Sequence, residues 1–146
     1  MTTEMDKEIR WLRTSCYTGA VFDGLAVIPM LSPTVGGAVF GIPDFQPGPE
    51  YRYAMGLAAS LMLGWTALLL WAARSPFRRK GVLVITVFPV IVGLATAGAY
   101  AVFTGVVPAS GMAPTWAFQT AIASLFIYSY VQAVRARAQG RSQGAR

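Results

Sequence analysis

Long apolar segments alternate with short polar or proline- and glycine-rich segments along this chain. The apolar segments occupy about residues 12–31, 52–73, 81–104 and 115–134. An α-helix rises 1.5 Å per residue, so about 20 residues cross a hydrocarbon core of about 30 Å. The pattern therefore predicts an all-α integral membrane protein, a four-transmembrane-helix bundle. We expect residues 1–134 to form a single four-helix membrane domain.

The segments outside the predicted spans differ in character. Residues 1–12 place Met5, Ile9 and Leu12 on one helical face, which favours an interfacial helix leading into the first span. Residues 32–50 hold four prolines and four glycines, so a regular helix is unfavourable there and a folded cap or interfacial segment is expected. Residues 135–146 are basic and small, and we expect a disordered tail.

Composition and charge agree with a membrane protein and indicate its orientation. Of the 146 residues, 55% are hydrophobic and 12% are charged, more apolar surface than a soluble fold of this size could bury. Eleven of the twelve Lys and Arg residues fall on the predicted side that holds both termini, and only Arg52 falls on the other. The positive-inside rule then predicts a multi-pass protein of the bacterial inner (plasma) membrane with both termini in the cytoplasm.

The net charge of +6 is therefore interpreted as a topology signal, and we expect no binding of nucleic acid. Basic groups beside a membrane span contact anionic headgroups of the lipid bilayer. The candidate headgroup contacts are Arg74, Arg78, Arg79, Lys80, Arg135 and Arg137.

Few residue types that carry chemistry are present. The chain has one cysteine, Cys16, and no histidine, so it can form no disulfide within itself and no histidine-ligated haem. The usual His/Cys zinc sites and the commonest general base are absent as well. We find no catalytic motif, and we expect no cofactor, no metal site and no enzymatic activity.

Asp23 is the one ionisable side chain well inside a predicted span. An aspartate at a helix centre costs roughly 2.5–3.5 kcal/mol on insertion scales, so we expect Asp23 to face the bundle interior or a wet cavity. Residues counted to similar depth could form a polar layer of hydrogen bonds around it. These are Ser60, Thr96, Gln119, Thr120 and Ser124.

Two interpretations of Asp23 stay open. The carboxylate could couple protons or bind a cation in a transport path, or it could be a hydrogen-bonded group that fixes packing or contacts a partner subunit.

Pro89 in the third span predicts a kink. Small residues at spacings of four favour close helix packing, and these positions are Gly56, Ser60, Gly64, Gly93, Ala97 and Ala101.

The segment Gly64-Trp-Thr-Ala-Leu-Leu-Leu-Trp-Ala-Ala-Arg-Ser-Pro-Phe-Arg-Arg-Lys-Gly81, with the spans on either side, resembles small uncharacterised bacterial membrane proteins that have four helices. The resemblance concerns architecture and implies no activity. The leading functional hypothesis is a non-enzymatic accessory, assembly or interaction subunit of a membrane complex, with a protein partner or as a homo-oligomer. The alternative is a small proton- or cation-coupled transporter or channel component that uses Asp23.

Overall fold

A computed structural model describes the backbone of residues 2–42 and 44–143 and the side chains of residues 6–42 and 44–136. Every regular element in these ranges is helical. The elements are α1 (Thr2–Leu31), α2 (Pro33–Phe40), α3 (Pro49–Ala73), α4 (Gly81–Ile85), the π-helix η1 (Thr86–Ile91), α5 (Val92–Phe103) and α6 (Ala109–Gln143).

Four helical segments of the described chain are long and apolar enough to cross a membrane, which confirms the predicted all-α architecture. They are Asp6–Leu31, Pro49–Ala73, Gly81–Phe103 and Ala109–Ala136, with mean hydropathies of 1.2, 1.6, 2.3 and 1.2. The third segment comprises α4, η1 and α5 in continuous succession. Large apolar side chains point outward on these helices: Phe103 is 91% exposed and Leu61 is 76% exposed.

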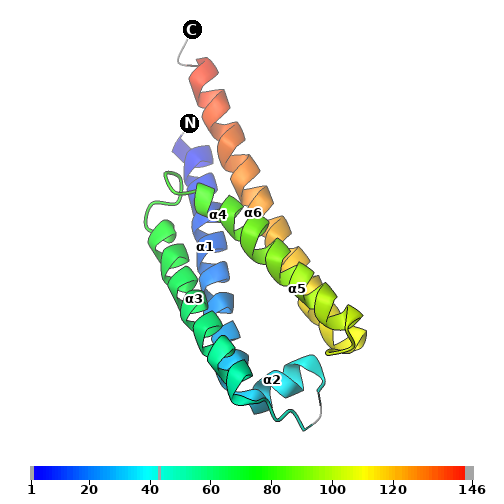
Figure 1. Ribbon diagram of the computed structural model, residues 1–146. Helices are drawn as coiled ribbons and strands as arrows, with labels where there is room; N and C mark the ends of the chain where they lie inside the picture. Colours follow the sequence, from blue (N-terminus) through cyan, green and yellow to red (C-terminus); the bar gives the residue numbers. More distant parts are fainter. Residues whose placement is uncertain (1, 43, 144–146) are drawn as a thin grey trace.

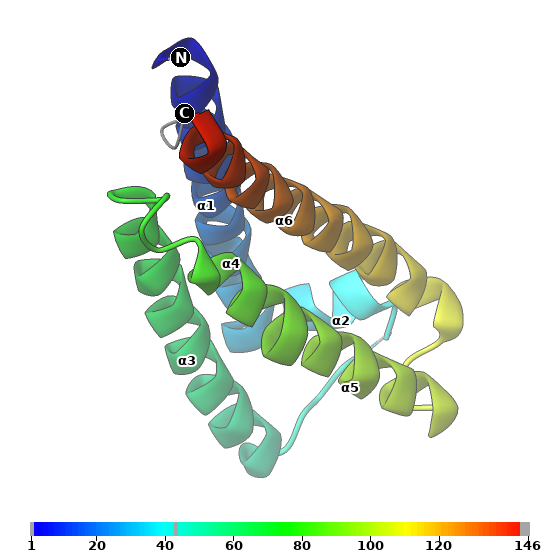
Figure 2. The ribbon, with the colours of Figure 1, turned by 90° about the horizontal axis from the view of Figure 1, so that it is seen from above.

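The four long segments form two pairs that diverge from one end of the molecule (Figure 1). In one pair α1 packs along α3, and in the other the α4–η1–α5 segment lies along α6. Both termini and the loop between α3 and α4 lie at the end where the pairs meet. At the other end, α2 lies between the diverging pairs, as the view from above also shows (Figure 2).

The hydrophobic core lies at the end where the pairs meet. Leu12 and Cys16 from α1 pack there with Leu69 from α3, Leu83 from α4 and Phe126 from α6, all nearly inaccessible. The hydroxyls of Ser15 and Ser129 share a buried hydrogen bond of 2.7 Å within the same region. These contacts hold the two pairs together at the end where they meet.

Gly19 permits close packing of α1 against α6. A Cβ atom at this position would lie 2.6 Å from Cζ of Phe126 and 3.1 Å from Cδ1 of Leu69. Real Cβ atoms do not tolerate the first distance, so glycine is required for the ring of Phe126 to pack here.

Two expectations about the flanking segments need correction. A regular helix was thought unfavourable in residues 32–50, yet Pro33–Phe40 is helical because Ser32 accepts a hydrogen bond from the amide of Val35, Pro33 occupies the first turn, and Gly41 (φ +66°) ends the helix. The expected disordered tail begins at residue 135, yet α6 continues to Gln143 because Ala, Arg and Gln are good helix formers.

The predicted irregularity at Pro89 takes the form of a π-helix. Pro89 lies inside η1, where the chain makes hydrogen bonds of wider spacing between Thr86 and Ile91. A proline has no amide hydrogen and its ring clashes with the preceding turn, so a local π-helix accommodates it within an otherwise continuous span.

Candidate functional site

A cavity of about 480 Å³ lies between the two diverging helix pairs. Side chains of α1, α3, η1, α5 and α6 line it, and Val39 and Phe40 of α2 close its end. It is partly open, neither enclosed within the bundle nor a flat surface. Its volume falls within the roughly 300–1,000 Å³ typical of small-molecule sites.

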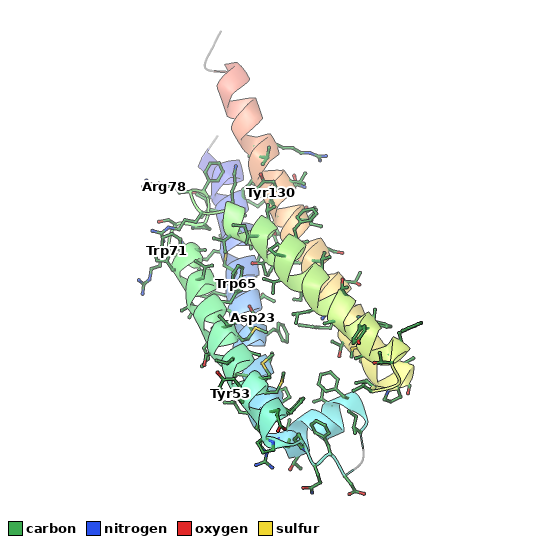
Figure 3. All side chains as sticks on the ribbon, viewed as in Figure 1. Asp23, Tyr53, Trp65, Trp71, Arg78 and Tyr130 are labelled. Carbon is green, nitrogen blue, oxygen red and sulfur yellow. The ribbon has the colours of Figure 1, made fainter. Side chains whose placement is uncertain are left out.

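Asp23 projects from α1 into this cavity and has an oxygen without a partner. The side chain is partly buried, and its Oδ2 atom is inaccessible and accepts no hydrogen bond. Figure 3 shows Asp23 near the middle of α1, in the space between the helix pairs. Because buried polar atoms are normally hydrogen-bonded, this oxygen is an unused acceptor.

Gln119 brings a second unused acceptor to the same cavity. It projects from α6, and its Oε1 atom is buried and has no hydrogen-bond partner. Asp23 and Gln119 lie 96 residues apart in the sequence, and the packing of α1 against α6 brings both to one cavity. Of the residues expected around Asp23, Gln119 is the one that shares its cavity.

The rest of the cavity wall is mostly apolar and carries no basic side chain among the described residues. Phe22 and Phe118 meet edge to face on it, with ring centroids 4.6 Å apart. Met30 and Met55 also contribute to the wall. The Thr86 hydroxyl is already engaged, because it donates to the carbonyl of Val82 and accepts from the Trp65 indole nitrogen.

The other members of the expected polar layer do not reach Asp23, which corrects that prediction. Ser60, Thr96, Thr120 and Ser124 are exposed, and each hydroxyl donates to a carbonyl of its own helix at 2.8–2.9 Å. Hydroxyls in apolar helices commonly bond the carbonyl four residues earlier, which leaves no need for a partner across the bundle. Thr120 and Ser124 instead line a separate shallow groove between α5 and α6, together with Gln119.

The two predicted small-residue stripes lie on exposed or partly exposed surfaces. The α3 stripe is Gly56, Ser60 and Gly64, and the α5 stripe is Gly93, Ala97 and Ala101. A Cβ atom at any of the three glycines would meet nothing within 4 Å. Neither stripe therefore brings two helices of this chain together.

The predicted headgroup contacts cluster at the end that holds both termini. Arg79 stacks on Trp71, with its guanidinium carbon 3.5 Å from the ring centroid, and donates to the Trp71 carbonyl. Lys80 Nζ lies 4.9 Å from the Phe77 ring centroid. Arg74, Arg78 and Arg135 are exposed, and Arg78 projects outward beside Trp71 (Figure 3). The side chain of Arg137 lies outside the described residues.

Sequence reasoning missed two features. Glu8 was treated as part of an interfacial lead-in, but it is only 9% exposed and its Oε2 atom has no hydrogen-bond partner. The methionine- and phenylalanine-rich cavity wall was missed as well. Its one sequence signal is Met30, which follows Asp23 by seven residues and therefore lies on the same face of α1.

No family model, no curated protein and no solved structure matches this chain. Within the described residues, no group of three or more His, Cys, Asp or Glu side chains could hold a metal ion.

Proposed function

We propose that the protein crosses the bacterial inner membrane four times, with both termini in the cytoplasm. The four long apolar segments and their outward-facing apolar side chains support insertion. The orientation is supported by the loop of residues 74–80, which lies at the same end as both termini, whereas Arg52 lies in the first turn of α3 at the opposite end.

Labelling of single cysteines tests this topology. In a Cys16→Ser background, a membrane-impermeant maleimide added to spheroplasts should label Gln46→Cys and leave Ser75→Cys unlabelled until the membrane is permeabilised. Labelling of Ser75→Cys in intact spheroplasts would reverse the proposed orientation.

Within this topology, the protein binds a membrane-soluble small molecule in the cavity, and Asp23 holds that molecule. The protein would act as a small component of a transporter or channel. The observation that carries this proposal is the presence of two partnerless acceptors, Asp23 Oδ2 and Gln119 Oε1, in one cavity of about 480 Å³. An acid that only fixed helix packing would have its oxygens hydrogen-bonded by neighbouring helices. An unused acceptor in an apolar recess is instead complementary to a ligand that donates hydrogen bonds.

Native mass spectrometry of gently extracted protein tests this function. The wild type should carry bound non-protein mass, and Ala26→Phe, which fills the cavity, should lose it. The matched control is Ala67→Phe, because Ala67 is exposed on α3 and lies outside the cavity. Bound mass that persists in Ala26→Phe, or that is missing from the wild type, would refute the proposal.

A second candidate function is an accessory or assembly subunit of a larger membrane complex, with a protein partner or a second copy of the chain. The α3 stripe favours it, because its glycines present small, exposed positions that this chain does not use for packing. Gentle extraction should then yield a complex of fixed stoichiometry that Gly56→Leu with Gly64→Leu disrupts. Recovery of the wild type as a monomer would reject this role. Neither role requires a bond to be made or broken.

The basic residues at the cytoplasmic end complete the proposed arrangement. Arg74, Arg78 and Arg135 are exposed there and would contact anionic headgroups, each at about 1 kcal/mol near the surface.

A further inference from the structure

We propose that the cavity between the helix pairs takes a lipophilic ammonium ion, a protonated primary or secondary amine on an apolar body, held between Asp23 and Gln119. This inference rests on the proposed binding function and names the chemical class of its ligand.

The charge of the ligand follows from the charge of the wall. Asp23 is the one acid on the cavity wall, and no Lys or Arg among the described residues lines it. A carboxylate in an apolar recess attracts a cation strongly because little solvent screens the interaction. A bound carboxylate ligand would instead meet the negative charge of Asp23 with nothing to offset it. An ionised Asp23 paired with an ammonium ion leaves the cavity neutral.

The number of donors on the ligand follows from the two unused acceptors. Asp23 lines the cavity from α1 and Gln119 lines it from α6. Oδ2 of Asp23 and Oε1 of Gln119 are both covered in the ligand-free structure, so each side chain would turn its oxygen toward a bound ligand. A primary or secondary ammonium has at least two N–H donors, one for each oxygen. A quaternary ammonium carries the same charge and no donor, so it satisfies the charge of Asp23 and neither hydrogen bond. An alcohol supplies one donor and no charge.

The body of the ligand follows from the remaining wall. Phe22, Phe118 and Phe126 line the cavity, and an aromatic face attracts a nearby cation. Met30, Met55 and Met62 supply flexible, polarisable side chains that fit alkyl or ring systems of various shapes. The lining thus combines one charged anchor with a large apolar surface.

The arrangement of the helices suits a ligand that arrives through the lipid. The cavity is partly open, and two of the helices that line it, α3 and α5, diverge below α4 in both views (Figures 1 and 2). An amphipathic amine concentrates in the bilayer and would reach Asp23 without crossing either aqueous end of the bundle.

Four ligands that share a ten-carbon chain and differ in headgroup test the proposal. The probes are decylammonium, decyltrimethylammonium, decanol and decanoate. Wild-type protein in nanodiscs of zwitterionic lipid is titrated with each, the unfolding midpoint is followed, and an empty-nanodisc titration corrects for partitioning. We expect decylammonium to bind at least about tenfold more tightly than decanol, the ratio expected for one charge-assisted hydrogen bond. Decyltrimethylammonium should fall between the two, and decanoate should not bind.

Variants then assign the preference to the two side chains. Asp23→Asn should abolish the advantage of decylammonium over decanol. Gln119→Leu should narrow the gap between decylammonium and decyltrimethylammonium without closing it, because decylammonium keeps its hydrogen bond to Asp23. Thr96→Val is the matched control and should leave all four affinities unchanged, because the Thr96 hydroxyl bonds its own helix outside the cavity.

The outcomes separate this inference from the function on which it rests. Equal binding of decanol and decylammonium by the wild type would overturn the ammonium assignment and leave a binding cavity in place. Failure of all four probes, with bound mass still lost in Ala26→Phe, would also overturn the assignment alone. Failure of all four probes together with no cavity-dependent bound mass would overturn both proposals. The wild-type comparison decides the assignment even if a variant does not fold.

Discussion

Replacing Asp23 with leucine should stabilise the ligand-free protein. Asp23 Oδ2 is buried without a partner, and the neighbouring wall is apolar. Insertion scales place aspartate about 3–4 kcal/mol above leucine at a helix centre. An unsatisfied buried polar group costs about 1–3 kcal/mol in folded proteins. Asp23 is only partly buried and its cavity is partly open, so both of these free-energy costs are reduced. We therefore expect Asp23→Leu to raise the free energy of unfolding by about 1–2 kcal/mol.

The assay is reversible unfolding of purified protein in mixed micelles with increasing sodium dodecyl sulfate, followed by circular dichroism. Asp23→Leu should raise the free energy of unfolding in the absence of ligand and reduce the stabilisation by decylammonium to that given by decanol. Thr96→Val removes a hydroxyl from an exposed helical position and should change the free energy by less than about 0.5 kcal/mol. A loss above about 1 kcal/mol in Asp23→Leu, with the control unchanged, would show that Asp23 holds the bundle together.

The remaining predictions concern the end where the helix pairs meet, and the same unfolding assay measures them. Gly19→Ala should lower the free energy of unfolding by about 1–3 kcal/mol, because its Cβ would lie 2.6 Å from Phe126. Gly93→Ala meets nothing within 4 Å and should cause no loss, so equal losses would contradict the packing. Ser15→Ala should cost about 0.5–1.5 kcal/mol, and adding Ser129→Ala should cost little more. Strictly additive losses would show that the two hydroxyls are not bonded to each other.

The number and type of the main helices could be predicted because they depend on local sequence. A run of about 20 apolar residues sets a helix that can cross a membrane, whatever lies beside it. The start of α1 at Thr2 agrees with the predicted helix that leads into the first span. The end of α6 at Gln143 was not predicted, because polar residues such as Arg and Gln continue a helix beyond its apolar part. The helix at Pro33–Phe40 was missed because its proline lies in the first turn, where it is favourable.

The site could be predicted only in part because it depends on how the helices are rotated and inclined. Thr96 was placed near Asp23 by counting residues from the membrane surfaces. That procedure assumes that the helices run parallel to one another and that both side chains face the bundle interior. The two pairs instead diverge, and Thr96 lies on an exposed face. In the same way, the close packing of α5 against α6 occurs at Gly98, whose Cβ would lie 3.1 Å from Met112 Sδ, and not at the Gly93 stripe. A spacing of four identifies a stripe of small residues and does not say which stripe is used.

Methyl NMR in nanodiscs tests the central claim, that Asp23 lies in a ligand-binding cavity between the helix pairs. Met30, Met55 and Met62 line the cavity, whereas Met112 is buried outside it, so methionine methyl labels supply site and control together. We expect decylammonium to shift the first three methyl signals, to show contacts to them through nuclear Overhauser effects, and to leave Met112 unchanged, with about tenfold more ligand needed for the same shifts in Asp23→Asn. Contacts absent from all three cavity methyls, or an affinity for decylammonium unchanged in Asp23→Asn, would contradict the claim.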